Sequence, residues 1–356
     1  MAIINGQLTS ADEVMNAMSS NFVDNANLLF NADYIGFNSK LNNDGVPQLK
    51  NVDYDTFTSD TATDTNMYYD SAMDAYIGPV QDDNDMSVLN DFTSDASNWS
   101  ITGSGDSGSE SVTDSGGMLV IKVTVSPSSA YQERTAVAVW DSQTNLFGDY
   151  SGVIRFYTGG ITGGGSGSYS PHMNGTVNVS LVGNSGQTVT IYAESGGGAE
   201  GWTVEATYID VIKIGTTLYI RTGASGNWTG TSLSDDTYGL KTTIYCKEGH
   251  GGSAGGTRYT QFKLDWAKYN DLADAMELIS PAATATASVT NIVGFFNYTS
   301  AGTVVHSISA DNGSNYTTVN MNEIARPTAG TQIKHKISIT EGTALITERA
   351  VKYNLY

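Results

Sequence analysis

Apolar and polar residues alternate along most of the chain, in short runs separated by turns rich in glycine, serine and asparagine. In 118–125 every second residue is apolar: Leu119, Ile121, Val123 and Val125. Such alternation places the apolar side chains on one face of a β-strand. Further runs of this kind are 152–159, 176–182, 188–194, 203–215, 216–223, 241–248 and 258–266. Many short strands joined by turns predict a two-sheet jelly-roll sandwich, with expected bounds 80–280.

A different pattern, with apolar residues three or four positions apart, occurs near the N-terminus. Ser10 and Glu13 have the spacing of a capping box, which marks the start of a helix. The apolar stripe that follows is Met15, Met18, Phe22 and Leu29. It predicts an amphipathic helix at about 11–31. We expect residues 1–79 to form an attachment domain, with this stripe as its assembly surface.

The C-terminal part returns to the strand pattern. Pro281 and the small residues after it predict a linker. Beyond it, one face of 331–340 carries Ile333, His335, Ile337 and Ile339. We expect 281–356 to form a small C-terminal β-sandwich, with His335 as a core residue. The predicted fold class is therefore mainly β, with a helix-bearing N-terminal domain, a central jelly roll and this last sandwich.

Four residues of 307–319 form the pattern S-x-D-x-G-x-x-aromatic: Ser309, Asp311, Gly313 and Tyr316. The pattern resembles the Asp-box of sialidase-type enzymes. We expect Asp311 to accept hydrogen bonds from the amides of its own turn, Gly313 to adopt a positive φ, and Tyr316 to pack under a hairpin. In sialidase-type folds the box is a structural turn remote from catalysis, so it indicates a hairpin and not a hydrolase.

Charge and cysteine content narrow the possible functions. The chain has 17 Lys and Arg against 37 Asp and Glu, and its net charge of −20 disfavours contact with nucleic acid or anionic membranes. Cys246 is the one cysteine, which excludes an intrachain disulfide and a thiolate zinc site. Neither a signal-peptide pattern nor a membrane-spanning apolar run is present, so we expect no membrane insertion. A chain of surface character that has neither an export signal nor disulfides is typical of a virion protein, because such a protein is made in the cytoplasm and released by lysis.

Three stretches of the central region are similar to concanavalin-A-like lectin and laminin-G jelly rolls. They are 89–105, with an Asp-Phe pair before a Trp strand; 213–229, with a Gly-Asn-Trp turn; and 259–270, with an Asp-containing strand before Tyr-Asn. The resemblance implies a lectin-like domain.

Segments near both termini resemble parts of tailed-bacteriophage virion proteins, fibres and appendages in particular. These segments are 5–22, 308–319, 329–340 and 346–356. The resemblance implies attachment to other virion proteins through the N-terminal domain, β domains directed outward, and homotrimers.

The sequence predicts no catalytic residues. Glu200, Glu205 and Asp210 lie five positions apart in one strand-like run, which places neighbouring members on opposite faces. A glycosidase needs two carboxylates that cooperate across a cleft. The histidines are scattered singly, without the spacing of a metal site.

Two acidic runs are compatible with a structural calcium ion, because carboxylates in loops are its usual ligands. One contains Asp82, Asp83 and Asp85, and the other Asp235 and Asp236. Neither has the spacing of a D-x-D-x-D-G loop, so ordinary acidic turns are the alternative. We expect no other cofactor.

Three aromatic residues at expected loop edges are candidates for glycan binding, namely Tyr169, Trp202 and Trp228. An aromatic ring stacks on the apolar face of a sugar, while neighbouring amides and carboxylates bind its hydroxyl groups. Each ring is alternatively a hairpin anchor or a partly buried core residue.

The function expected from these observations is that of a non-enzymatic virion protein, a fibre or appendage that adheres to host-surface glycans as a homotrimer. Many weak contacts would become effective through multivalency. One alternative is a protein that decorates or cements the capsid without a receptor role. A further alternative is a polysaccharide depolymerase with a cleft between subunits.

Overall fold

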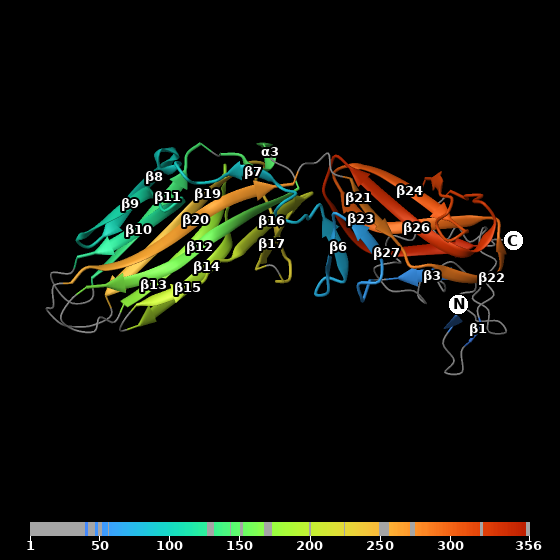
Figure 1. Ribbon diagram of the computed structural model, residues 1–356, viewed down its shortest axis with the longest axis horizontal. Helices are drawn as coiled ribbons and strands as arrows, with labels where there is room; N and C mark the ends of the chain where they lie inside the picture. Colours follow the sequence, from blue (N-terminus) through green and yellow to red (C-terminus); the bar gives the residue numbers. More distant parts are fainter. Residues whose placement is uncertain are drawn as a thin grey trace. The chain divides into compact units, whose positions relative to one another are not determined.

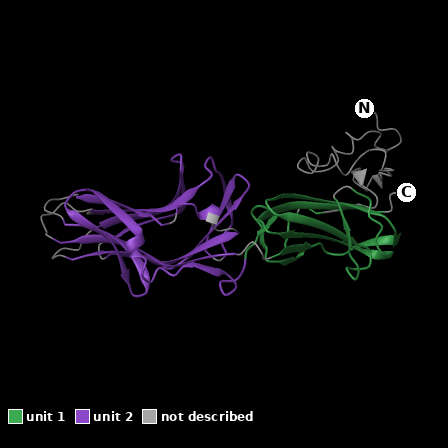
Figure 2. Ribbon diagram, turned by 90° about the horizontal axis from the view of Figure 1, so that it is seen from above, with its two compact units in different colours: residues 1–80, 272–356 green, residues 81–271 purple. Residues whose placement is uncertain are grey.

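The computed structural model shows a mainly β protein, which confirms the predicted fold class (Figure 1). It describes residues 40–41, 47–48, 52–55, 57–126, 132–142, 144–149, 152–166, 173–198, 201–223, 225–248, 256–270, 275–320 and 323–353. Two compact units are present: unit 1 comprises Met1–Val80 and Leu272–Tyr356, and unit 2 comprises Gln81–Asp271 (Figure 2).

Unit 2 contains a nine-stranded antiparallel sheet with the order β18-β17-β16-β12-β20-β10-β9, in which β15 also pairs with β12 and β7 with β20. Its strands are β7 (Ser87–Asn90), β9 (Gly108–Ser115), β10 (Met118–Val125), β12 (Val153–Gly165), β15 (Trp202–Val204), β16 (Tyr208–Ile214), β17 (Thr217–Thr222), β18 (Thr229–Ser232) and β20 (Arg258–Tyr269). The register between β12 and β20 shifts near Gly160, whose φ of 86° a glycine adopts without strain.

The second sheet of unit 2 has five strands in the order β14-β13-β19-β11-β8. They are β8 (Trp99–Gly105), β11 (Glu133–Trp140), β13 (Met173–Gly183), β14 (Thr188–Gly198) and β19 (Tyr238–Glu248). Two short helical segments, η2 (Ala96–Asn98) and α3 (Leu146–Asp149), connect strands.

The alternating apolar residues of both sheets meet in one core. Buried residues of β10 and β20 pack with those of β11, β13 and β19, which makes unit 2 a two-sheet sandwich. At one end of the core, Trp99 and Trp140 stack with ring centroids 5.8 Å apart, and Phe92 lies 5.3 Å from Trp140. The apolar face expected for 118–125 is buried as a whole.

Unit 1 is also built from two antiparallel sheets. The six-stranded sheet has the order β25-β24-β26-β21-β4, with β22 paired to β26; the other has the order β23-β27-β6-β5, with β3 paired to β27. The strands are β3 (Val52–Asp55), β4 (Thr63–Thr65), β5 (Tyr68–Asp70), β6 (Ala75–Gly78), β21 (Met276–Ile279), β22 (Ala283–Val289), β23 (Ile292–Ser300), β24 (Thr303–Ser309), β25 (Thr317–Val319), β26 (Gly330–Thr340) and β27 (Ala344–Tyr353). A separate pair, β1 (Lys40–Leu41) and β2 (Pro47–Gln48), precedes them.

The division of the chain differs from the expected one in two respects. Strands before residue 80 do not form a domain of their own, because β3 and β6 pair with β27 and β4 pairs with β21. Strand β21, expected in the jelly roll, also belongs to unit 1. Unit 2 is therefore an insertion into a sandwich made from both ends of the chain.

The predicted helix at 11–31, with Met15, Met18, Phe22 and Leu29, lies outside the described residues. Within the described part of the chain, no helix has the length and apolar character needed to cross a membrane.

Candidate functional site

Two of the three aromatic candidates have their rings enclosed by the protein. Trp228 is 2% exposed, and the guanidinium of Arg221 lies over its ring at 4.9 Å from the centroid. Its proposed role as a sugar platform is therefore wrong, because neither face of a buried ring can receive a ligand. Tyr169 lies outside the described residues.

Trp202 is half-buried and lies among glycines of three strands. A Cβ atom on Gly163 of β12 would be 2.1 Å from the indole Nε1, and one on Gly196 of β14 would be 2.3 Å from the ring. A Cβ on Gly175 of β13 would be 2.8 Å from it. The glycines make room for the ring between the two sheets, so Trp202 is an anchor of the sandwich and not an open platform.

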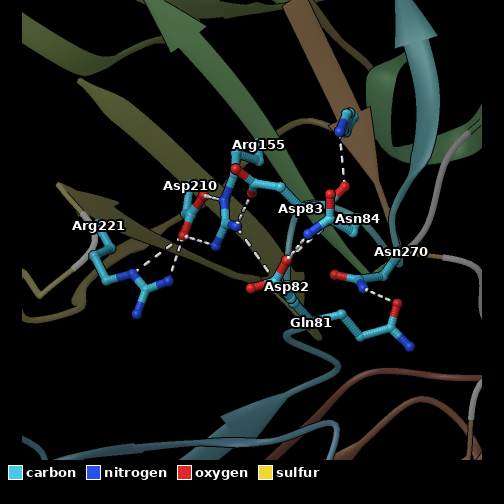
Figure 3. Close-up of polar contacts among 9 residues, drawn as sticks. Gln81, Asp82, Asp83, Asn84, Arg155, Asp210, Arg221 and Asn270 are labelled. Carbon is cyan, nitrogen blue, oxygen red and sulfur yellow. Dashed lines mark hydrogen bonds and ion pairs between the residues drawn. The ribbon is translucent and has the colours of Figure 1, made fainter. Parts of the chain in front are cut away.

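Asp210 of β16 lies between two arginines on neighbouring strands (Figure 3). Arg155 of β12 donates from Nε to Oδ1 at 2.6 Å and from Nη2 to Oδ2 at 2.9 Å. Arg221 of β17 donates from Nε to Oδ2 at 3.1 Å. All three side chains are buried. Since both of its oxygens are bound by guanidinium groups, Asp210 is a structural anion and not a catalytic acid.

Residues 81–84, which precede β7, connect this network to β20 through hydrogen bonds and an ion pair (Figure 3). Asp83 forms a second ion pair with Arg155, and its backbone oxygen accepts a hydrogen bond of 2.7 Å from Lys268 Nζ. Burial alone would lower the pKa of Arg155, but the hydrogen bonds and charges of Asp210 and Asp83 raise it. The guanidinium therefore keeps its charge inside the sheet.

In the acidic run at 82–85, Asp83 pairs with Arg155, and Asp82 stabilises the turn beside it. Asp82 Oδ1 accepts hydrogen bonds from the backbone and the side-chain nitrogen of Asn84, at 3.1 and 2.8 Å. Among the residues that the structure describes, no group of three His, Cys, Asp or Glu side chains is placed to hold a metal ion. In the second run, Asp235 is buried against Gly183 and Asp236 is exposed.

The structure does not show a pair of cooperating carboxylates among the glycosidase candidates Glu200, Glu205 and Asp210. Asp210 is ion-paired with Arg155 and Arg221, and Glu205 is exposed; Glu200 lies outside the described residues.

The Asp-box forms the predicted turn in unit 1. Ser309 Oγ accepts hydrogen bonds from the backbone nitrogens of Asp311 and Gly313, at 3.2 and 2.9 Å, and donates to Asp311 Oδ1 at 2.7 Å. Asp311 Oδ1 also accepts from the amide of Asn315 at 2.9 Å, and Gly313 has a φ of 84°. Hydrogen bonds to Asn315 and Ser309 lower the pKa of Asp311 to about 2.

The strands around this turn pair as a hairpin of β24 and β25, as expected. Tyr316 lies beside Gly313, and Lys336 Nζ is 5.0 Å from its ring centroid. The box is a structural turn in this protein as well.

Two histidines are buried together in unit 1, which the sequence did not predict as a pair. His306 is 6% exposed and His335 is 1% exposed, with ring centroids 6.2 Å apart. Phe296 packs on both rings. Their four ring nitrogens have no hydrogen-bond partner among the described residues. Burial lowers the pKa of His306 to about 4 and, with the charges of His306 and Arg349, lowers that of His335 well below 6.5.

A pocket of about 410 Å³ opens on the outer face of the five-stranded sheet of unit 2. The ends of β11, β13 and β19 and the turn before α3 surround it. Its lining residues are Val139, Trp140, Asp141, Thr144, Asn145, Val182, Gly183, Asn184, Thr237, Gly239, Leu240 and Lys241. The volume is within the range of small-molecule sites.

The register explains why a depression forms here. Val182 of β13 pairs with Gly239 of β19, and Lys241 of β19 pairs with Val139 of β11. Gly239 carries no side chain, so the sheet surface is low between these larger neighbours. The turn that contains Asn145 forms a wall beside it.

One polar atom without a protein partner belongs to a lining residue of this pocket. Asn145 Oδ1 is buried and has no hydrogen-bond partner among the described residues. Buried donors and acceptors are normally satisfied, and a polar ligand is one means of doing so.

Sequence reasoning missed this pocket because its residues come from three strands that are separated along the chain. The one local signal was the break in alternation at 140–145, where a strand ends in a polar turn.

Comparisons with known proteins place the chain in no family. No family model matches it, and no curated protein matches it. Among solved structures, the carbohydrate recognition domain of Emp47p matches at 10% identity over 53% of this chain and 99% of that chain, with a TM-score of 0.25. The lectin UEA-II in complex with galactose matches at 11% identity over 52% and 99%, with a TM-score of 0.23.

A protein of unknown function with a galectin-like fold, from Bacillus subtilis, matches at 10% identity over 52% of this chain and 98% of that chain, with a TM-score of 0.21. TM-scores this low establish neither a common fold nor a common function.

Proposed function

We propose that this chain is a non-enzymatic bacteriophage virion protein, a fibre or appendage, that adheres to a host-surface glycan through the pocket of unit 2. The pocket is the observation that carries the proposal. It combines an apolar floor with polar side chains around its rim and one buried amide oxygen without a protein partner, that of Asn145, a combination that suits a sugar.

The composition supports the virion part of the proposal. The net charge of −20 disfavours nucleic acid as the partner, and the chain resembles fibre and appendage proteins near both termini. A homotrimer attached through the N-terminal segment would present several pockets at once, and multivalency would strengthen weak single-site binding.

Binding without cleavage is favoured by the state of the carboxylates. Asp210, the buried carboxylate of the sheet, is neutralised by Arg155 and Arg221. In the lining of the pocket, Asp141 Oδ1 accepts a hydrogen bond of 2.9 Å from Ser100 Oγ. A pair of cooperating carboxylates is what glycoside hydrolysis requires.

The test is binding of the full chain to an array of bacterial surface polysaccharides. Lys241→Gln removes a charged donor from the rim, and we expect it to weaken binding about 10-fold or more. Lys247→Gln is the matched control, because Lys247 lies on the same strand but does not line the pocket. Binding to no glycan would favour a capsid-decorating role, and release of reducing ends from a bound polysaccharide would overturn the non-enzymatic assignment.

A further inference from the structure

The floor of the pocket is apolar, whereas the outer face of β19 beyond the pocket is polar. Elsewhere on the outer face of β19, Thr243, Tyr245 and Lys247 carry hydroxyl groups or a charge. At the pocket, Val182 lies directly opposite the low point at Gly239, and Val139, which lies opposite Lys241, is diagonal to it. Val139 is 37% exposed, which is unusual for a large apolar side chain in this protein.

This floor is too small for an apolar ligand but suits an apolar substituent. A sugar hydroxyl placed between the two valines would lose its water without gaining a partner, which is unfavourable. A methyl group placed there would bury apolar surface instead.

The rim supplies partners for an amide and for hydroxyl groups. Asn145 and Asn184 carry amides, and Thr144 and Thr237 carry hydroxyls. One cation, Lys241, and one anion, Asp141, line the pocket, so their charges cancel. Lys241 forms no ion pair with any residue that the structure describes, which leaves its ammonium group available to a ligand oxygen. A neutral ligand fits this balance better than an anion, because the protein as a whole is strongly acidic.

We infer that the pocket selects an N-acetylated amino sugar, with the acetamido methyl group over Gly239 between Val139 and Val182. The acetamido group joins a methyl to an amide, the same two kinds of surface that the floor and rim present. The inference rests on the proposed function and names the sugar class that the same site takes.

The experiment compares N-acetylglucosamine and N-acetylgalactosamine with glucose and galactose, all as multivalent conjugates, on the full chain. We expect the acetylated sugar of at least one pair to bind about 10-fold or more tighter, since one methyl-sized group in an apolar site is worth that much. Equal binding within both pairs would overturn the inference while the glycan-binding function stands. Binding to no sugar and to no bacterial polysaccharide would instead overturn the proposed function.

Two variants locate the selectivity. Gly239→Val fills the low point with a side chain that suits a strand, and we expect it to remove the preference for acetylated sugars. Val139→Thr keeps the shape of the floor but adds a hydroxyl, and we expect it to reduce the preference with little loss of binding to the parent sugar. Thr243→Val, on the same strand outside the pocket, is the control. Unchanged selectivity in both pocket variants, each with the thermal stability of the wild type, would show that the acetamido group binds elsewhere.

Discussion

Arg155 and Asp210 lie opposite each other on β12 and β16 and form a two-point ion pair that is almost fully removed from solvent. Arg221 completes the group from β17. In low dielectric surroundings the mutual attraction offsets desolvation only while every charge keeps its partner. We therefore expect the network to favour this pairing of β12, β16 and β17, whatever its net contribution to stability.

Asp210→Asn should destabilise unit 2 strongly, because it removes the carboxylate shared by two buried guanidinium groups and leaves Arg155 with Asp83 as its remaining ion-pair partner. We expect a loss of about 3–5 kcal/mol in the free energy of unfolding, measured by denaturant titration. Glu133→Gln, which breaks the exposed pair with Lys247, should cost less than about 1 kcal/mol. A triple variant with Arg155→Met, Asp210→Leu and Arg221→Met should recover most of the loss, and a triple variant as unstable as Asp210→Asn would contradict this account.

Unit 1 should lose stability in mild acid through His306 and His335. Both histidines are neutral in the folded chain, with pKa values below the ordinary 6.5, whereas unfolding restores ordinary values. The unfolded state then binds more protons as the pH falls below 6.5, so stability is complete above that value and decreases toward the folded pKa of about 4 for His306. At pH 5 the expected loss through His306 is about 2 kcal/mol, and His335 adds to it in the same direction.

The measurement is the free energy of unfolding between pH 7.5 and pH 5, above the range in which most carboxylates titrate. A double variant with His306→Phe and His335→Phe should show a much smaller pH dependence. Parallel pH profiles for the wild type and the double variant would argue against the histidines as its source.

Ser309→Ala should weaken the Asp-box turn. The hydroxyl is buried and serves two backbone amides and Asp311, so its loss leaves amides without an acceptor. We expect a cost of about 1–3 kcal/mol in unit 1. Ser314→Ala, in the same turn but exposed, should change the stability by less than about 0.5 kcal/mol. Similar effects of the two variants on the midpoint of unfolding would refute the assigned role.

Gly196→Ala should overpack the Trp202 anchor, because the added methyl group would collide with the indole ring. The expected cost is about 1–3 kcal/mol, with a change in tryptophan fluorescence. In a double-mutant cycle with Trp202→Leu, the cost of the added methyl group should largely disappear. If the cost is the same in both backgrounds, the ring is not what the glycine accommodates.

Local patterns in the sequence were sufficient for the strands and the Asp-box. Val123 and Val125 alternate with the polar Lys122 and Thr124, and that alternation depends only on which face of the strand meets a core. The turn at Ser309 and Asp311 was predictable because its hydrogen bonds join residues within a few positions of one another.

Pairings between distant parts of the chain could not be predicted in the same way. Nothing local to 63–65 indicates that β4 pairs with β21, more than two hundred positions later. Trp202 and Trp228 were candidates for glycan binding because they lie at expected loop edges, with a buried position as the alternative. The choice between the two could not be made locally, since the glycines that surround Trp202 in space come from three other strands. The pocket shares this origin, since Val182, Gly239 and Val139 become neighbours only through sheet register.

The insertion of unit 2 into unit 1 has a consequence for the order of folding during synthesis. Residues 81–271 are contiguous, so unit 2 has all of its strands as soon as β20 has been translated. Strand β6 ends at Gly78, but its partner β27 begins only at Ala344. Strand β6 therefore stays without its partner β27, and with an unpaired edge, until the whole of unit 2 has been translated. If unit 2 folds first, residues 81–271 become a compact connection between the two parts of unit 1. The flexible loop that closes when β6 pairs with β27 is then shorter.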